Sequence, residues 1–351
     1  MSNRNLPEMI FDSSVQFHDL IHALIEWPEL YPHMKQNPEN ASVVVKLTLQ
    51  TVEDYKAGKE AAYYSLHRAL DLLYSINIHP MEQKPVFNQY DPTLMRIQKE
   101  LEEAWEAYED SRFPDIDIPT DTKEFQRWFM RTILDHEAAN HQLYAYLEER
   151  CSREEMSYFF SQEITVDSRF DDLVALAQVG TSDVIKMELA ENYWDEMGNG
   201  EMDKVHTVMF NYLLDELGLL NDTNTLSLVE GAGWQSLAVG NTLLYSALYR
   251  KNLYRALGCL GAVELVAPKR FSRLVKGFKR LGISEKGREY HTLHIQIDTR
   301  HGHGWVKNAI IPIIKDNPEA RIEIVKGAFL RLNTSMDYCN KIYDQFSKVS
   351  V

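Results

Sequence analysis

The strongest chemical pattern in the chain is HTLHIQIDTRHGHGW, in which His294, Asp298 and His301 stand at positions i, i+4 and i+7. Because an α-helix turns by about 100° per residue, these spacings put the three side chains on one helix stripe. Two imidazoles and a carboxylate suit iron or manganese better than a metal that prefers thiolates. Burying such groups on an apolar helix face costs free energy unless an opposite charge compensates them, so we predict a metal site. The neighbouring His291 and His303 are interpreted as ordinary core or surface histidines.

A second cluster lies in KMELAENYWDEMGNGEMDKVHTVMF, where Glu196 precedes His206 by ten residues, with Gly198 and Gly200 between them. On an unbroken helix, ten steps leave two side chains about 80° apart, so sharing a metal requires a bend at the glycines. An exposed acidic face is the alternative, because several other carboxylates lie close to Glu196 in the sequence. These are Glu188, Glu191, Asp195 and Glu201.

Two further carboxylates each interrupt an apolar segment: Glu163 in MSYFFSQEI and Glu264 in CLGAVELVAP. A carboxylate buried without a partner is costly, and a metal ion would supply that partner. Pairing with an arginine, or a position at a helix surface, remains open for each glutamate. With the first two clusters, these residues supply four carboxylates and three histidines. Such an inward-facing set is typical of di-iron carboxylate helix bundles.

The sequence segments that carry these residues are all predicted to form helices. Apolar residues recur at three- and four-residue spacing, and no segment shows the strict alternation of a half-buried strand. We therefore predict an all-α protein. Asp121 is a predicted N-cap, with Glu124 three residues later. The expected helices cover residues 42–78 with a break near Gly58, 94–108, 121–151, 153–164, 170–179, 182–197, 201–217, 243–257, 259–281, 289–308 and 318–346.

The composition of the chain limits its possible binding partners and its domain organisation. The chain has 351 residues, 44% of them hydrophobic, and a formal charge of -15, so nucleic acid and anionic membrane surfaces are unlikely partners. One basic run, residues 269–280, is interpreted as a solvated helix flank. Cys151, Cys259 and Cys339 form no disulfide or zinc pattern. We expect residues 1–120 to form a helical region for packing or dimerisation, and residues 121–351 to form the catalytic domain of a homodimer.

No apolar run of about 18 residues occurs, and the first residues lack a cationic segment followed by an apolar one. We therefore expect no membrane span and no export, and a cytoplasmic location.

These motifs together resemble the haem-oxygenase-like di-iron oxidases and oxygenases, also described as iron-containing redox enzymes. The resemblance covers roughly residues 153–308 and rests on the glutamate of FFSQE with the following VDSRFDDLVALAQVG, on NYWDEMGNG with its later histidine, on the GAVELVAP glutamate and on HxxxDxxH. It implies a haem-oxygenase-like seven-helix bundle, preceded here by the N-terminal helical region. It also implies two iron ions, bound as Fe(II) and reacting with O2, with an external reductant compatible with the chemistry. The implied metal ligands are Glu163, Glu196, His206, Glu264, His294, Asp298 and His301.

Within that set, Glu196 and Asp298 are the residues we expect to take part directly in the reaction. The family suggests N-oxygenation of a small amine-bearing substrate to a hydroxylamine or nitro product in a biosynthetic pathway. Oxidative cleavage of carbon–carbon bonds in an amino acid or fatty acid is the alternative. Four aromatic residues near the predicted site would suit a cationic amine or an ordinary core: Tyr193, Trp194, Trp234 and Trp305.

Two explanations of other classes remain. The helical scaffold could bind or hydrolyse a small metabolite without metal, in which case Cys259 is the cysteine nearest to a predicted site residue. Alternatively, the chain could be a helical interaction module with its histidines at the surface. That reading would leave the apolar settings of Glu163 and Glu264 unexplained.

Overall fold

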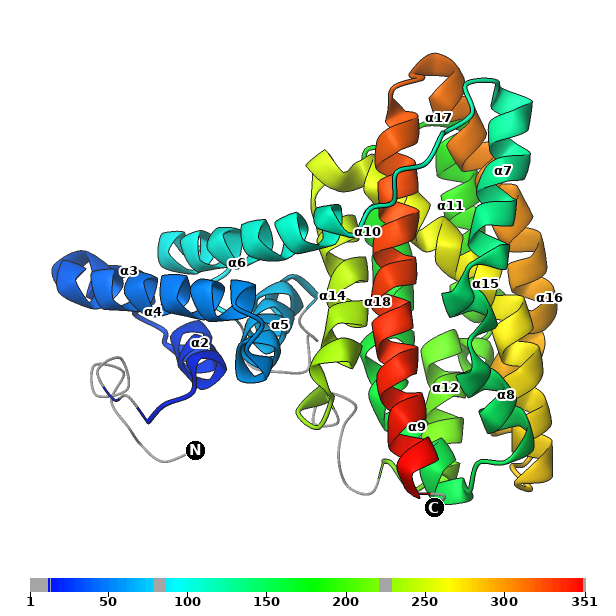
Figure 1. Cartoon of the computed structure of the whole chain (residues 1–351), viewed down its shortest axis with the longest axis horizontal. Helices are drawn as coiled ribbons and strands as arrows, with labels where there is room; N and C mark the ends of the chain where they lie inside the picture. Colours follow the sequence, from blue (N-terminus) through cyan, green and yellow to red (C-terminus); the bar gives the residue numbers. More distant parts are fainter. Residues whose placement is uncertain (1–11, 13, 79–85, 221–228, 350–351) are drawn as a thin grey trace. The chain divides into compact units, whose positions relative to one another are not determined.

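The computed structural model describes residues 12, 14–78, 86–220 and 229–349 (Figure 1). Throughout these ranges the regular structure is helical and no strand is present, so the prediction of an all-α protein is confirmed. None of the described helices combines the length and apolar character that a membrane span requires. The first residues, on which the expectation of no export rests, lie outside the described ranges.

The chain divides into two compact units, Met1–Arg112 and Phe113–Val351. The boundary falls ahead of the position at residue 120 expected from the sequence. Within the first unit, α4 packs against both α5 and α6. The helices of this unit are α2 (Phe17–Glu26), α3 (Leu30–Gln36), α4 (Pro38–Lys56), α5 (Glu60–Ser75) and α6 (Pro92–Ser111). The expected break near Gly58 separates α4 from α5, and this glycine has a positive φ of 75°. A role of this unit in packing or dimerisation stays a prediction.

The second unit contains all the predicted metal ligands. Several of its helices run roughly along one direction, with α18 beside α14 and α15 (Figure 1). Its helices are α7 (Thr122–Asp135), α8 (Gln142–Glu149), α9 (Arg153–Asp167), α10 (Phe170–Gln178), α11 (Asp183–Glu196), α12 (His206–Glu216), α14 (Trp234–Leu248), α15 (Leu253–Arg280), α16 (Glu289–Gly304), α17 (Ile311–Asp316) and α18 (Ala320–Val349). A π-helical segment, Trp305–Ile310, joins α16 to α17.

Helix α15 lies at the centre of this unit, packed against α16, α18, α8 and α14. The expected break at Gly258 is wrong, because α15 continues through this residue and the chain is interrupted earlier, between α14 and α15. A Cβ atom on Gly258 would lie 1.8 Å from the carbonyl oxygen of Ile324. The absence of a side chain at this glycine therefore allows α15 to approach α18 closely, and the glycine does not end a helix.

The predicted helix over residues 121–151 begins as expected, because the Asp121 carboxylate accepts a hydrogen bond of 2.9 Å from the Glu124 amide. It is nevertheless two helices, α7 and α8. The Nδ1 atoms of His136 and His141 accept hydrogen bonds from the amides of Ala138 and Leu143. These two histidines are thus N-caps at the interruption and have a structural role.

Candidate metal centre

Helix α16 carries His294, Asp298 and His301, and all three side chains are buried. The i, i+4, i+7 spacing puts them on one stripe of the helix, as predicted from the sequence. They do not converge on a single point. His294 belongs to one group of ligand atoms, whereas Asp298 and His301 belong to another. One helix thereby contributes to two neighbouring groups.

The first group, Glu196–His206–His294, joins α16 to the α11–α12 turn. Glu196 is the last residue of α11 and His206 is the first residue of α12. Glu196 Oε2 lies 2.6 Å from His206 Nδ1, and this nitrogen lies 3.0 Å from His294 Nε2. Glu196 and His206 therefore meet, although an unbroken helix would separate them.

The bend that brings them together requires glycine. Gly198 has a φ of 60°, and a Cβ atom there would lie 2.5 Å from the carbonyl carbon of Lys204. An L-residue with a side chain is strained by both the dihedral angle and the contact. The glycine pair noted in the sequence thus has a structural function, namely to fold the α11–α12 turn back on itself.

The second group, Glu264–Asp298–His301, joins α15 to α16. Its ligand atoms, like those of the first group, lie within 4.8 Å of one another. His301 Nδ1 is 3.8 Å from Glu264 Oε2, which has no hydrogen-bond partner among the described residues. Four residues after Glu264 comes Pro268, which cannot donate a hydrogen bond to the Glu264 carbonyl oxygen. The packing of α15 on α16 brings Glu264 close to Asp298 and His301.

The three carboxylates of these groups lie in an environment that disfavours their charge. Burial raises the pKa of Glu196 to about 7. Burial, and then the negative charge of Glu196, raise the pKa of Glu264 well above its usual value. Burial and the charges of Glu264 and Glu196 do the same to Asp298. Because Asp298 and Glu196 belong to different groups, the two groups are close enough to interact electrostatically.

The three histidines are neutral in this environment and can therefore donate a nitrogen lone pair to a metal. Burial lowers the pKa of His206 to about 4 and that of His294 to about 3, and it lowers the pKa of His301. Buried carboxylate oxygens that repel one another, neutral imidazoles and the unpartnered Glu264 Oε2 fit a pair of divalent cations. The residues present thus suit iron.

Two groups outside the ligand set orient the imidazoles. His294 Nδ1 lies 2.6 Å from the Tyr290 carbonyl oxygen, which leaves Nε2 facing the first group. His301 Nε2 lies 2.8 Å from Asp195 Oδ2, which leaves Nδ1 facing the second group. Asp195 also accepts hydrogen bonds from Arg300 and from Asn199, the latter at 2.9 Å. A carboxylate or carbonyl on the far nitrogen is the usual partner of a metal-bound histidine.

Glu163 lies outside both groups. Its Oε2 atom accepts a hydrogen bond from Arg270 Nη2, which is the arginine pairing that the sequence left open. The structure gives no support to Glu163 as a metal ligand, because a buried guanidinium already compensates its charge. Arg270 itself is buried, so the basic run to which it belongs is not wholly the solvated flank expected from the sequence.

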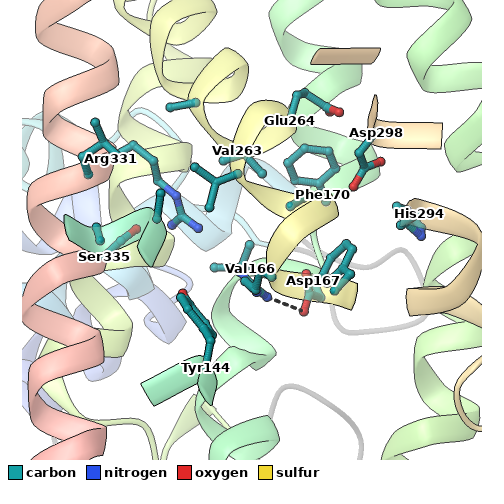
Figure 2. Close-up of a pocket in the computed structure, with 18 of the residues that line it drawn as sticks. Tyr144, Val166, Asp167, Phe170, Val263, Glu264, His294, Asp298, Arg331 and Ser335 are labelled. Atoms are coloured by element: carbon teal, nitrogen blue, oxygen red, sulfur yellow. Dashed lines mark ion pairs between the residues drawn. The ribbon is translucent and has the colours of Figure 1, made fainter. Parts of the chain in front are cut away.

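A pocket reaches the two groups from the side of α18 (Figure 2). Glu196, Glu264, His294 and Asp298 contribute to its wall. The four aromatic residues expected near the site do not line it. Trp194 is 54% exposed, and Trp305 is buried with its indole N–H donating to the Leu257 carbonyl. The aromatic side chains that line the pocket are those of Tyr144, Phe170, Phe271 and Tyr290.

The alternatives of other classes gain no support from the site. Cys259 is buried, does not line the pocket, and burial raises its pKa to about 11, so it is a poor nucleophile. The histidines of the two groups are buried, which is not the surface arrangement of an interaction module.

Sequence reasoning missed several charged residues that face the site. In the sequence, Asp195 is one of several carboxylates close to Glu196, and no feature distinguishes Asp171 from the adjacent Asp172. The charge of Asp171 acts on both Glu196 and His206. Asp167 and Arg331 line the pocket. No spacing signal marks these residues, because they lie on different helices, α9, α10, α11 and α18, and do not form a repeated pattern of charged residues along any one of them.

Comparison with known proteins agrees with this chemistry. A family model described as "Iron-containing redox enzyme" matches residues 157–336, which include every predicted ligand. The chain belongs to this family. The match confirms the resemblance seen in the sequence and the haem-oxygenase-like all-α fold. The chain is an oxidoreductase, and iron is the metal of its family.

One curated relative is the 4-chloro-allylglycine synthase of Streptantibioticus cattleyicolor. It is 26% identical to this chain over 262 residues, which cover 72% of this chain and 91% of the relative. The similarity therefore extends over nearly the whole length of an enzyme named for an amino-acid product.

Proposed function

We propose that this protein binds two iron ions, one in each ligand group, and uses O2 to oxidise a small amine-bearing substrate. The observation that carries the proposal is the pair of buried ligand groups to which α16 contributes, in which Glu196 of the first group raises the pKa of both carboxylates of the second. Two divalent cations would compensate this accumulated charge. The proposed ligands are Glu196, His206, Glu264, His294, Asp298 and His301.

The bound irons would supply the activation of O2, with an external reductant returning them to Fe(II) where the reaction requires it. The protein's own residues position the ligands and shape the pocket. Asp195 and the Tyr290 carbonyl hold His301 and His294 in the tautomers that face the ligand groups. Phe170, Phe271 and Tyr290 line the pocket next to the ligands and exclude water from it.

Two reactions are compatible with this arrangement, and the comparison with the relative ranks them for testing. The name of the relative specifies an amino acid that carries an alkene and no nitrogen–oxygen bond. This favours oxidative fragmentation of an amino acid as the first reaction to examine. N-oxygenation of an amine, which the sequence suggested first, is the second.

Anaerobic titration with Fe(II), followed by exposure to 18O2, tests the proposal. We expect two equivalents of Fe(II) per chain, substrate-dependent O2 consumption, and products that distinguish the two reactions by mass spectrometry. A lost carbon fragment indicates carbon–carbon cleavage, and 18O retained on nitrogen indicates N-oxygenation. Binding of no iron, or binding that is unchanged after His294→Ala, would overturn the proposal.

We also propose that the protein is a cytoplasmic homodimer, with residues 1–120 as the packing or dimerisation region. The three buried, unpaired cysteines suit a reducing compartment. Sedimentation velocity on the full chain and on a chain that begins at residue 113 tests the dimer. A full chain that sediments as a monomer at micromolar concentration would contradict it.

A further inference from the structure

The pocket has a second polar region, formed by Arg331 of α18 and Asp167 of α9. Figure 2 shows Arg331 extending from α18 towards the middle of the pocket, on the opposite side from His294 and Asp298. The two ends of the pocket thus differ in chemistry, with the ligand groups at one end and an arginine at the other.

Arg331 is a buried cation with unused hydrogen-bonding capacity. Its side chain is 7% exposed, and its Nη1 atom has no hydrogen-bond partner among the described residues. A buried donor without a partner costs free energy that a ligand can recover. The planar guanidinium matches a carboxylate, to which it can donate two parallel hydrogen bonds.

Asp167 is the complementary anion. It is 7% exposed, and its Oδ2 atom has no hydrogen-bond partner within the part of the chain that the structure describes. Arg270 Nη2 forms an ion pair with this oxygen at 3.9 Å but donates its hydrogen bond to Glu163. The Tyr290 hydroxyl reaches the other oxygen, Oδ1, only at 3.5 Å. Asp167 therefore keeps an oxygen available to a cationic group.

The unused hydrogen-bonding atoms decide between classes of substrate. Arg270 donates its hydrogen bond to Glu163 and is only ion-paired with Asp167, so Arg331 keeps an unused donor and Asp167 keeps an unused acceptor, and both residues line the pocket. A fatty acid would satisfy Arg331 and leave the Asp167 Oδ2 atom without a hydrogen-bond donor. A simple amine would satisfy Asp167 and leave Arg331 without an anion. An α-amino acid carries both opposite charges on one carbon atom.

We infer that Arg331 and Asp167 bind the carboxylate and the ammonium group of an α-amino acid substrate, whose side chain extends through the pocket towards the two ligand groups. The inference rests on the proposed function for its chemistry, but the binding itself does not require iron. It names two specificity-determining residues and selects amino acids over fatty acids and simple amines. It also places the oxidation on the side chain of the amino acid, away from its charged head.

Equilibrium binding tests the inference, first with a panel of the proteinogenic L-amino acids and L-norleucine. Ligand-observed NMR on the metal-free and the anaerobic Fe(II)-loaded protein identifies which of them bind. The strongest binder is then compared by calorimetry with two analogues, one without its ammonium group and one without its carboxylate. For L-norleucine these analogues are hexanoate and pentylamine. If no amino acid in the panel binds to either form of the protein, the inference is overturned.

Substitutions in the two residues sharpen the test. We expect Arg331→Gln and Asp167→Asn each to weaken binding of the amino acid by about tenfold to a hundredfold. Arg331→Gln should also weaken hexanoate, whereas Asp167→Asn should not, and Arg331→Lys should restore part of the affinity. Arg321→Gln, on the same helix but outside the pocket lining, and Asp172→Asn, which is exposed, are the matched controls.

The outcomes separate this inference from the proposed function. Thermal melts of all variants show whether they fold, and their Fe(II) stoichiometry shows whether the ligand groups are intact. Amino-acid binding that depends on Arg331 in a protein that binds no iron would support the inference and overturn the proposed function. Amino-acid affinity that is the same in Arg331→Gln and Arg321→Gln would overturn the inference, even if two irons bind.

Discussion

The two ligand groups differ in charge and in what holds them together, although α16 contributes to both. The first group has one carboxylate and two imidazoles, and its ligand atoms already contact one another at 2.6 and 3.0 Å. The second has two carboxylates and one imidazole, with the His301 and Glu264 ligand atoms 3.8 Å apart. The first group is therefore held partly by its own hydrogen bonds, whereas the second depends more on a cation.

The groups also differ in their structural origin. A glycine-dependent turn between α11 and α12 forms the first group, and the packing of α15 on α16 forms the second. A local change in the backbone should therefore damage the first group, and a change in charge should damage the second. Four predictions test this difference, in order of decreasing expected effect.

Removal of a ligand should have the largest effect. Asp298→Ala should lower the bound iron from two ions to about one per chain and reduce activity by about a hundredfold or more, because the second group loses one of its two carboxylates. His206→Ala should remove the other iron. Elemental analysis and Mössbauer spectroscopy of the anaerobic Fe(II) protein measure these losses. If both variants lose the same iron, the two groups are not independent sites.

Gly198→Ala should damage the first group selectively. The alanine would have to adopt a φ of 60° and would place its Cβ atom 2.5 Å from the Lys204 carbonyl carbon. The dihedral strain alone costs about 1–3 kcal/mol, so we expect a lower Tm and loss of iron from the first group. Gly282→Ala is the matched control, because Gly282 has a φ of 72° with no atom near the added Cβ. Equal iron content in the two variants would contradict the prediction.

Asp195→Ala should weaken the second group without removing it. Loss of the partner of His301 Nε2 lowers metal affinity by about 10–100-fold in comparable sites. We expect Asp195→Asn to have an intermediate effect, because it keeps an acceptor without the charge. Anaerobic Fe(II) titration with a competing chelator gives the two affinities. The control is Asp203→Asn, which changes an exposed carboxylate between α11 and α12 and should bind iron as the unmodified protein does.

The pH dependence of the metal-free protein should show the smallest effect. The pKa of Glu196 is raised to about 7 in the folded protein from an ordinary value of 4.5, mainly by burial. Its contribution to stability is therefore fully present below about pH 4.5 and is lost as the pH rises through about 7.

The comparison with Glu196→Gln isolates this contribution from that of the histidines, whose lowered pKa values act in the opposite direction. With a chelator present, the Tm of the unmodified protein minus that of Glu196→Gln should fall between pH 5 and pH 8. Excess Fe(II) should reduce this dependence. A difference in Tm that stays constant or rises with pH would show that Glu196 is not buried as a proton-binding group.

Much of the site could be predicted from the sequence because α-helices have a fixed period. The spacing of His294, Asp298 and His301 placed them on one stripe of α16, and the glycines between Glu196 and His206 indicated the bend that the structure contains. Glu264 was recognisable because an isolated carboxylate in an apolar helix needs a partner. The same argument applied equally to Glu163, and the sequence could not show that Arg270 is that partner.

The sequence by itself therefore determined the helical fold, the family and most of the residues in the two ligand groups, since these follow from local periodicity, residue type and the motifs that the chain shares with its family. Only the tertiary structure decided how the ligands divide into two groups, that Asp195 faces His301, and that Arg331 and Asp167 meet in one pocket. These relationships join residues on separate helices. They depend on how α9, α11, α15, α16 and α18 pack, which no spacing along the chain records.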